Sequence, residues 1–467
     1  MHEAVQILVV GGGPAGSTTA TLLARAGFSV TLLERETFPR YHIGESLLPS
    51  CLPILDLMGA REKIEAHGFQ RKGGAYFEWG TEKWDLRFND LDDTTYSWQV
   101  IRSEFDHLLL EHAKSQGVDV REGVSVKEIV FDGDRAVRAV WERSDRNGGG
   151  EISFDFLVDA SGRAGLMATK HLGSRRFHDV FKNVGVWGYW QGTKELEPGP
   201  DGAIAVCSIP QGWLWAIPLH DETVSIGVVT SKAHLREKQA ERADLEEIYL
   251  TKIAESPLIA DLIDGARLVS EVKAESDYSY VTEAFAGPGY ALVGDAACFL
   301  DPLLSTGVHL ATYSGLLAAA SITSVLRDGV AEEHALRFYA KAYEKAYERL
   351  LVLVSVFYQS YRGRDEHFFE AQKLTSREKR RLNLHEAFLH IVTGIEDLAD
   401  AKEKAYEVVA DRLAGPNAPT NNPLANHNAS MEQMPDSPSR ALAGLYLETE
   451  PKLTLRRADD AAVQTGK

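Results

Sequence analysis

The sequence has few cysteines, no long apolar run at its start and no surplus of positive charge, and each shortage excludes a class of protein. The three cysteines, Cys51, Cys207 and Cys298, form no CxxC pair, which argues against a disulfide scaffold and against a structural metal site. The apolar opening from Val5 to Val10 is too short to span a membrane and follows no basic segment typical of a signal peptide. A formal charge of −18 argues against nucleic acid as a partner. We therefore expect a cytoplasmic protein without a membrane span.

The order of predicted elements indicates an interrupted α/β fold. At 467 residues, the chain is long enough for two packed domains with appendages. It begins with a strand, a glycine loop, a helix and a second strand, which together make a βαβ unit. Short β-type runs follow, including residues 151–158, before a strand over 290–293 and a helix over 307–327 resume the first domain. We predict a Rossmann domain from residues 1–86 and 289–330, an inserted substrate-domain sheet within 87–288, a helical region over 331–414 and a mostly disordered tail over 415–467.

The glycine loop carries a dinucleotide-binding pattern. The run Gly11-Gly12-Gly13-Pro14-Ala15-Gly16 fits GxGxxG, in which backbone N–H groups and a helix N-terminus meet a pyrophosphate. Glu34 follows 18 residues after Gly16, where a carboxylate accepts hydrogen bonds from ribose hydroxyls and disfavours NADP. The predicted cofactor contacts are Gly11, Gly13, Pro14, Ala15, Gly16 and Glu34.

A second glycine-containing motif, far downstream in the sequence, indicates that the bound dinucleotide is FAD rather than NAD. In Gly294-Asp295-Ala296-Ala297, the Asp295 carboxylate can bind the ribityl or pyrophosphate portion of the cofactor, so that the chain folds back on one molecule. Arg102 is a further candidate for the FAD edge, and a solvated arginine at a helix start is the alternative interpretation.

Residues 211–218 read Gln-Gly-Trp-Leu-Trp-Ala-Ile-Pro. Because side chains alternate across a strand, Trp213 and Trp215 are predicted to lie on one face. Two indoles arranged in this way form a wall, and two ordinary core residues are the alternative.

These motifs together resemble glutathione-reductase-type flavoproteins related to aromatic hydroxylases, and three further runs are similar to those of flavin-dependent halogenases. The resemblance covers most of residues 5–365, and its most specific part is the double-Trp run. It implies that reduced FAD and O₂ oxidise chloride or bromide to a hypohalous acid in secondary metabolism, with FADH₂ supplied by a separate flavin reductase. It also makes Arg40 and Ser46 candidate FAD contacts. The further runs are Phe38-Pro39-Arg40, Ile43-Gly44-Glu45-Ser46 and Asp301-Pro302-Leu303-Leu304-Ser305-Thr306-Gly307.

The resemblance also assigns roles at the reacting centre. Ser305, Thr306 and Gly307 open the long helix, whose N-terminus attracts anions, so they are the candidate halide site. A helix cap by Ser305 or Thr306 is the plainer alternative. Lys72 matches the family lysine that receives hypohalous acid, as an ammonium donor or as a chloramine, although a lysine beside glycines is more often solvated. Trp213 and Trp215 would keep the organic substrate away from the flavin.

One departure bears on the substrate. Tryptophan halogenases carry a glutamate directly before the Ser-Thr-Gly run, where this chain has Leu304. That difference moves the resemblance toward halogenases of phenols and pyrroles, some of which act on groups tethered to a carrier protein. The alternatives are an FAD-dependent aromatic monooxygenase, which would hydroxylate its substrate, and a non-catalytic flavin-binding protein.

Overall fold

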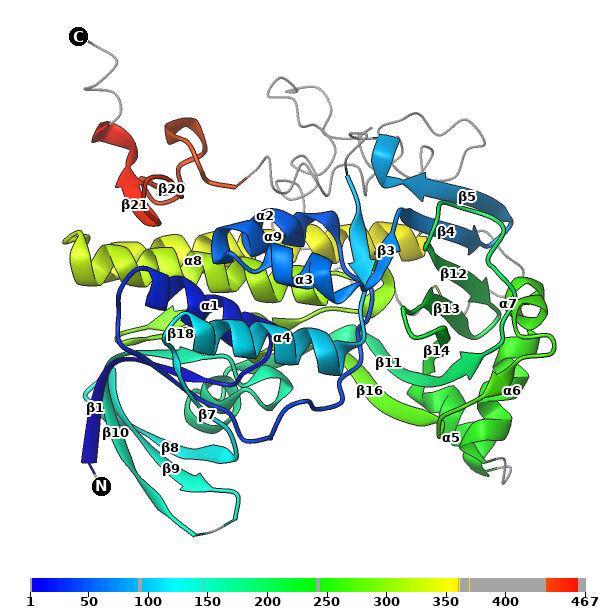
Figure 1. Ribbon diagram of the computed structural model, residues 1–467, viewed down its shortest axis with the longest axis horizontal. Coiled ribbons are helices and arrows are strands. Elements are labelled where there is room, and N and C mark those ends of the chain that lie inside the picture. Colours follow the sequence, from blue (N-terminus) through cyan, green and yellow to red (C-terminus); the bar gives the residue numbers. More distant parts are fainter. Residues whose placement is uncertain are drawn as a thin grey trace.

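The computed structural model describes residues 2–90, 95–145, 147–240, 244–359, 361, 369 and 434–460. Within these ranges the chain folds into two large β-sheets and two groups of helices, the smaller of which lies against the second sheet (Figure 1). The helices are α1 (Pro14–Arg25), α2 (Leu52–Met58), α3 (Arg61–His67), α4 (Arg102–Ser115), α5 (Lys232–Ala240), α6 (Leu245–Ala254), α7 (Pro257–Leu262), α8 (Gly307–Arg327) and α9 (Glu332–Gln359).

The first sheet has a parallel centre, as a dinucleotide-binding fold requires. Strand β1 pairs in parallel with β2 on one side and with β10 on the other. Ile7, Leu8 and Val9 of β1 are fully buried, because helices or other strands cover both faces of a central parallel strand. The strands described in this sheet are β1 (His2–Val10), β2 (Val30–Leu33), β7 (Asp119–Arg121), β8 (Val124–Asp132), β9 (Arg135–Arg143), β10 (Gly149–Asp159), β17 (Ala286–Gly287) and β18 (Tyr290–Leu292).

The second sheet is mostly antiparallel and carries the double-Trp run on β13. Its path runs β19-β16-β11-β14-β13-β12-β4-β5, with β15 paired to β11. The strands described here are β4 (Gly74–Trp79), β5 (Glu82–Arg87), β11 (Arg175–Gln191), β12 (Ile204–Ile209), β13 (Gly212–Pro218), β14 (Thr223–Ser231), β15 (Arg267–Leu268), β16 (Lys273–Thr282) and β19 (Cys298–Phe299). A separate short pair joins β3 (Gln70–Lys72) to β6 (Ser97–Gln99).

The fold class is the predicted one, but two of the domain boundaries are wrong. The strand over 151–158, expected in the inserted sheet, is β10 of the first sheet and pairs with β1. Conversely, β4 lies within 1–86 and β5 begins there, yet both belong to the second sheet. Strand composition alone does not show which sheet a strand joins, since that depends on partners far away in the sequence.

Helix α8 is the long, buried helix at the centre of the helical group. It is long and apolar enough to cross a membrane, but 94% of that apolar window is buried inside the protein. Helix α9 lies beside it (Figure 1). On α9, the hydroxyl of Tyr339 donates to the carbonyl of Leu292, and that of Tyr343 donates to Gly294 O over 3.1 Å. Tyr339 and Tyr343 of α9 therefore support the strand and turn that precede α8.

The end of the chain contradicts the predicted tail. Residues 434–460 contain a hairpin of β20 (Leu445–Glu448) and β21 (Thr454–Arg457). Leu445, Leu447 and Leu455 are buried, and the Leu455 N–H donates to Ser324 Oγ of α8 over 2.7 Å. The buried leucines of the hairpin supply the apolar surface by which this segment packs against the rest of the protein. The remainder of the predicted tail, and most of the helical region expected over 331–414 beyond α9, lie outside the described residues.

Candidate active site

A cavity of about 680 Å³ is lined by residues of both sheets. Ligand sites of this kind typically measure about 300–1,000 Å³. The predicted cofactor residues Gly11, Gly13, Pro14, Ala15, Glu34, Arg40, Ser46, Arg102 and Asp295 line it, together with Trp213, Trp215, Ser305, Thr306 and Gly307. The structure therefore gathers predicted positions almost 300 residues apart in the sequence around a single space.

The glycine loop needs its glycines for close backbone approach. Gly11 has a φ of +109°, and a Cβ there would lie 2.2 Å from Ala160 O. A Cβ on Gly16 would lie 1.9 Å from Gly11 O. Side chains at either position would open the turn, so the loop presents its backbone to the cavity as a pyrophosphate site requires.

Glu34 directly follows β2, and its carboxylate is fixed beside this loop. One oxygen accepts the Gly12 N–H over 2.6 Å, and the other accepts the Glu36 N–H over 2.8 Å. Glu34 is only 5% exposed. Its position at the cavity wall is the one from which a carboxylate contacts a ribose.

Arg102 is buried rather than solvated, and it holds the wall of the cavity. Its guanidinium donates twice to Asp106, over 2.9 and 3.0 Å, and also donates to the carbonyls of Ile43 and Gly44. Burial opposes the charge on Asp106, but the Arg102 guanidinium keeps the pKa of that carboxyl below its usual range. Arg40 adds a second ion pair to Asp106 at 3.2 Å. Ile43 and Gly44 are therefore held against α4.

On the other side, Asp295 lines the cavity from the short turn Gly294–Ala296. Burial raises the pKa of this carboxyl to about 6, and Arg163 and Arg102 oppose that rise. The glycine loop, Glu34 and Asp295 form a backbone cradle with a carboxylate on either side. This donor and acceptor set fits FAD, which needs a pyrophosphate cradle and acceptors for its ribose and ribityl hydroxyls.

The Ser305–Gly307 turn presents polar groups without partners to the same cavity. Ser305 adopts a left-handed conformation with a φ of 58°. Thr306 is the N-cap of α8, yet its Oγ1 is buried and has no hydrogen-bond partner among the described residues, so Thr306 does not form the side-chain cap that was the alternative interpretation. A Cβ built on Gly307 would meet nothing within 4 Å. Space is therefore open beside the start of α8, where the first amides have no partner within the helix and suit a small anion.

The two tryptophans lie on one face of β13, as the alternation predicts. Their ring centroids are 6.0 Å apart at an interplanar angle of 53°. The Trp215 indole covers Gly227 of β14, where a Cβ would lie 2.1 Å from the ring. Its Nε1 donates to Ser225 Oγ over 3.2 Å. Both side chains are less than 10% exposed, so the wall is rigidly packed.

A chain of hydrogen bonds connects the two tryptophans to the segment just before the Ser305–Gly307 turn. Trp213 Nε1 donates to Tyr358 Oη over 2.8 Å, and the Tyr358 hydroxyl contacts both Asp301 oxygens at 3.2 and 3.1 Å. Asp301 also accepts the Leu303 N–H over 3.1 Å, at the start of the turn Pro302–Leu304. Burial raises the pKa of Asp301 to about 6 against these hydrogen bonds.

Lys72 is not a solvated loop residue. It ends β3, is 2% exposed, and donates from Nζ to Ser46 Oγ over 2.8 Å and to Leu47 O over 2.9 Å. Burial lowers the pKa of this amine to about 7. Lys72 is absent from the cavity lining, but Ser46 lines it, so one hydroxyl separates the lysine from that space.

Sequence reasoning missed Tyr358, although a signal for it was present. On α9, Tyr347, Leu351 and Val354 recur at the spacing of one helix face, and Tyr358 is the next position on that face. Leu304 is 3% exposed and packs in the core, so no carboxylate stands directly before the Ser305–Gly307 turn.

Comparisons with known proteins agree with this geometry. A model of the tryptophan halogenase family matches residues 6–90 and 85–414. The tryptophan 2-halogenase of Chondromyces crocatus is 48% identical over 408 residues, covering 86% of this chain and 78% of the relative. The flavin-dependent halogenase armH3 of Armillaria mellea is 42% identical over 381 residues, covering 77% and 75%. The structure of the myxobacterial chondrochloren halogenase CndH superimposes with a TM-score of 0.74 at 34% identity, covering 88% of this chain and 97% of CndH.

Proposed function

The chain belongs to the flavin-dependent halogenase family, and from that premise we propose that it chlorinates or brominates an electron-rich aromatic ring, phenolic or pyrrolyl in character. The observation that carries this proposal is the buried Lys72 amine, which donates to the hydroxyl of Ser46 at the cavity wall. The same cavity is lined by the Ser305–Gly307 turn and by the two tryptophans. A separate flavin reductase would supply the reduced cofactor.

In this mechanism each element of the cavity has one task. FAD, when bound and reduced, supplies with O₂ the oxidising equivalents that convert halide to hypohalous acid. The amides at the start of α8 and the Thr306 hydroxyl hold the halide. Trp213 and Trp215, which line the same cavity, would keep the organic ring away from the flavin, so that the ring meets the oxidised halogen instead.

Lys72 receives the oxidised halogen and fixes its position. Two N–H groups of Lys72 are used by Ser46 and Leu47, which sets the direction of the remaining valence of Nζ. A group positioned in this way confines reaction to one ring carbon and thereby sets both rate and regiochemistry.

The choice of substrate class follows from Leu304. Because this position lacks a carboxylate, a ring that already donates electron density needs less assistance than an indole carbon, and phenols and pyrroles meet that condition. The relative from Chondromyces crocatus is named a tryptophan 2-halogenase, so the exclusion of tryptophan gains no support from the comparisons. Tryptophan is therefore the second candidate.

The test is mass spectrometry of products from a panel of phenols, pyrroles and tryptophan, each free and, where an acyl group permits, tethered to a carrier protein. The mixture contains the protein, FAD, NADH, a flavin reductase, O₂ and chloride or bromide. We expect halide-dependent products from phenol or pyrrole members. Product from tryptophan alone would refute the substrate class, and oxygen insertion independent of halide would replace halogenation with the monooxygenase alternative.

A second prediction concerns Tyr358, which we propose as the residue that holds the Trp wall in place. The substitution Tyr358→Phe keeps the ring but removes the acceptor for Trp213 Nε1 and the donor to Asp301. Each such hydrogen bond contributes about 1 kcal/mol and two are lost, so we expect product formed per FADH₂ consumed to fall at least about fivefold, with peroxide released instead. FAD affinity should not change.

The matched control is Tyr446→Phe, in the C-terminal hairpin and outside the cavity lining. The measurement is the ratio of product to peroxide in each variant. An unchanged ratio in Tyr358→Phe would mean that the hydroxyl only fills space.

A further inference from the structure

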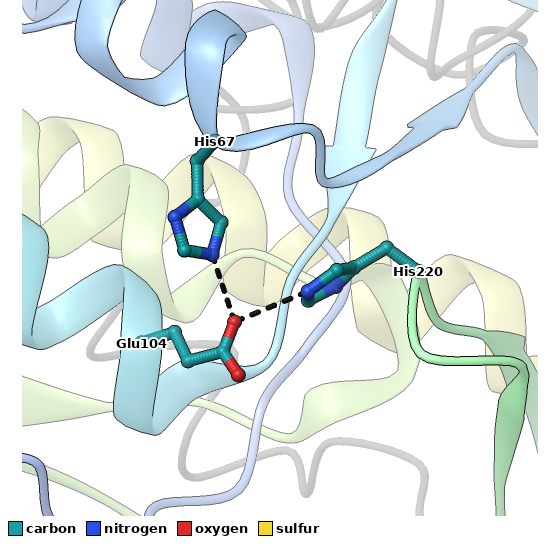
Figure 2. Close-up of side chains that lie close together, drawn as sticks. All are labelled: His67, Glu104 and His220. Atoms are coloured by element: carbon teal, nitrogen blue, oxygen red, sulfur yellow. Dashed lines mark hydrogen bonds and ion pairs between the residues drawn. The ribbon is translucent and has the colours of Figure 1, made fainter.

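A second cluster of reactive side chains lies outside the cavity. His67 ends α3, Glu104 stands in the first turn of α4, and His220 lies in the turn between β13 and β14. Figure 2 shows the two imidazoles converging on the carboxylate of Glu104. Three segments that are far apart in the sequence thus bring together one carboxylate oxygen and two ring nitrogens.

The spacing of these atoms is close to that of a metal site. Glu104 Oε2 is 2.8 Å from His67 Nε2 and 3.1 Å from His220 Nε2, and the ligand atoms all lie within 4.8 Å of one another. Tetrahedral zinc ligands at about 2.0–2.1 Å from the ion lie about 3.3–3.4 Å apart. Shifts of a few tenths of an ångström at the carboxylate, and an approach of the two ring nitrogens from a separation of at most 4.8 Å, would produce that geometry.

The packing around the cluster orients both rings in advance. Phe69 contacts the His67 ring with centroids 4.2 Å apart and meets the His220 ring edge-on at 5.2 Å. The side chains of His67, Glu104 and His220 are 33%, 38% and 21% exposed, so an ion can enter from solvent. Within the described part of the chain, no lysine or arginine lies at ion-pair distance from Glu104 to compete for its charge.

We propose that His67, Glu104 and His220 bind a zinc ion that ties the β13–β14 turn to α3 and α4. Two imidazoles and one carboxylate are a zinc-binding set, and the fourth position would be left to water. The tie has a structural consequence, because β13 carries Trp213 and Trp215 and His220 follows the end of that strand by two residues. Zinc would therefore fix the strand that forms the wall.

The experiment measures zinc binding to the untagged full-length protein by competition with a chromophoric chelator. We expect one Zn²⁺ per chain, with affinity reduced at least about tenfold in each of His67→Ala, Glu104→Gln and His220→Ala. His334→Ala, an exposed histidine of α9, is the matched control and should bind as the parent does. The cysteines do not confuse the measurement, since Cys51, Cys207 and Cys298 are all buried.

Thermal melting supplies an independent measurement. Zn²⁺ should raise the melting temperature of the parent and of His334→Ala, but not that of the three ligand variants, because an ion that binds only the folded state stabilises it. FAD content and melting without metal show whether each variant is folded. The proposal is overturned if the parent binds no stoichiometric zinc, or if folded ligand variants bind it as tightly as the parent.

Discussion

Substitution of Lys72 by methionine is expected to lower halogenated product by at least about 100-fold while leaving FAD binding and FADH₂ oxidation intact. Lys72 acts after the halide is oxidised, so its removal leaves the oxidised halogen without a fixed position, and loss of positioning of this kind costs about 10²-fold or more. Methionine has a similar length and no charge, and the site is 2% exposed, so the apolar replacement suits its surroundings. Product yield and flavin reoxidation, measured in the same reaction, separate the two steps.

The matched control for this variant is Lys63→Met. Lys63 lies on α3, is exposed, and donates to Ser115 Oγ rather than to any residue of the cavity. It should halogenate as the parent does. Retained product in Lys72→Met, with normal flavin reoxidation, would remove Lys72 from the mechanism and transfer the positioning role to another group.

The part of the site that could be predicted from the sequence consists of local motifs. The glycine loop, Glu34 and the start of α8 depend on residues a few positions apart or on one βαβ unit, so spacing determines their geometry. The alternation along β13 likewise placed Trp213 and Trp215 on one face, where they line the cavity.

Contacts between segments that are far apart along the chain could not be predicted from the sequence. Whether Arg102 is solvated or clamped depends on Asp106 one turn later and on the carbonyls of Ile43 and Gly44. The link from Trp213 through Tyr358 to Asp301 joins β13, α9 and the turn before α8. Such partners become neighbours only through the tertiary fold.

The second large effect is on the pH dependence of halogenation. Burial lowers the pKa of Lys72 to about 7 from an ordinary 10.5, so the amine is half deprotonated near neutral pH. The neutral amine has two N–H groups, and Ser46 and Leu47 accept both, which leaves its lone pair for the oxidised halogen. We therefore expect the product yield, corrected for flavin reoxidation at each pH, to fall about 100-fold from its plateau to pH 5. A yield that instead decreases as pH rises through 7 would assign the work to the ammonium form.

The same pKa shift predicts a change in stability that requires no turnover. Between the folded value of about 7 and the ordinary 10.5, the unfolded chain holds one more proton at Lys72 than the folded chain does. The free energy of unfolding should therefore increase by up to about 1.4 kcal/mol per pH unit, because of this group, as the pH rises from about 7 toward 10.5. It should decrease by the same amount as the pH falls back toward 7. Urea unfolding at pH 7 and pH 9 measures it, with Lys72→Met as the reference in which this contribution is absent. Equal pH dependence in the two proteins would mean that Lys72 keeps its proton in the folded state, and the amine mechanism would lose its basis.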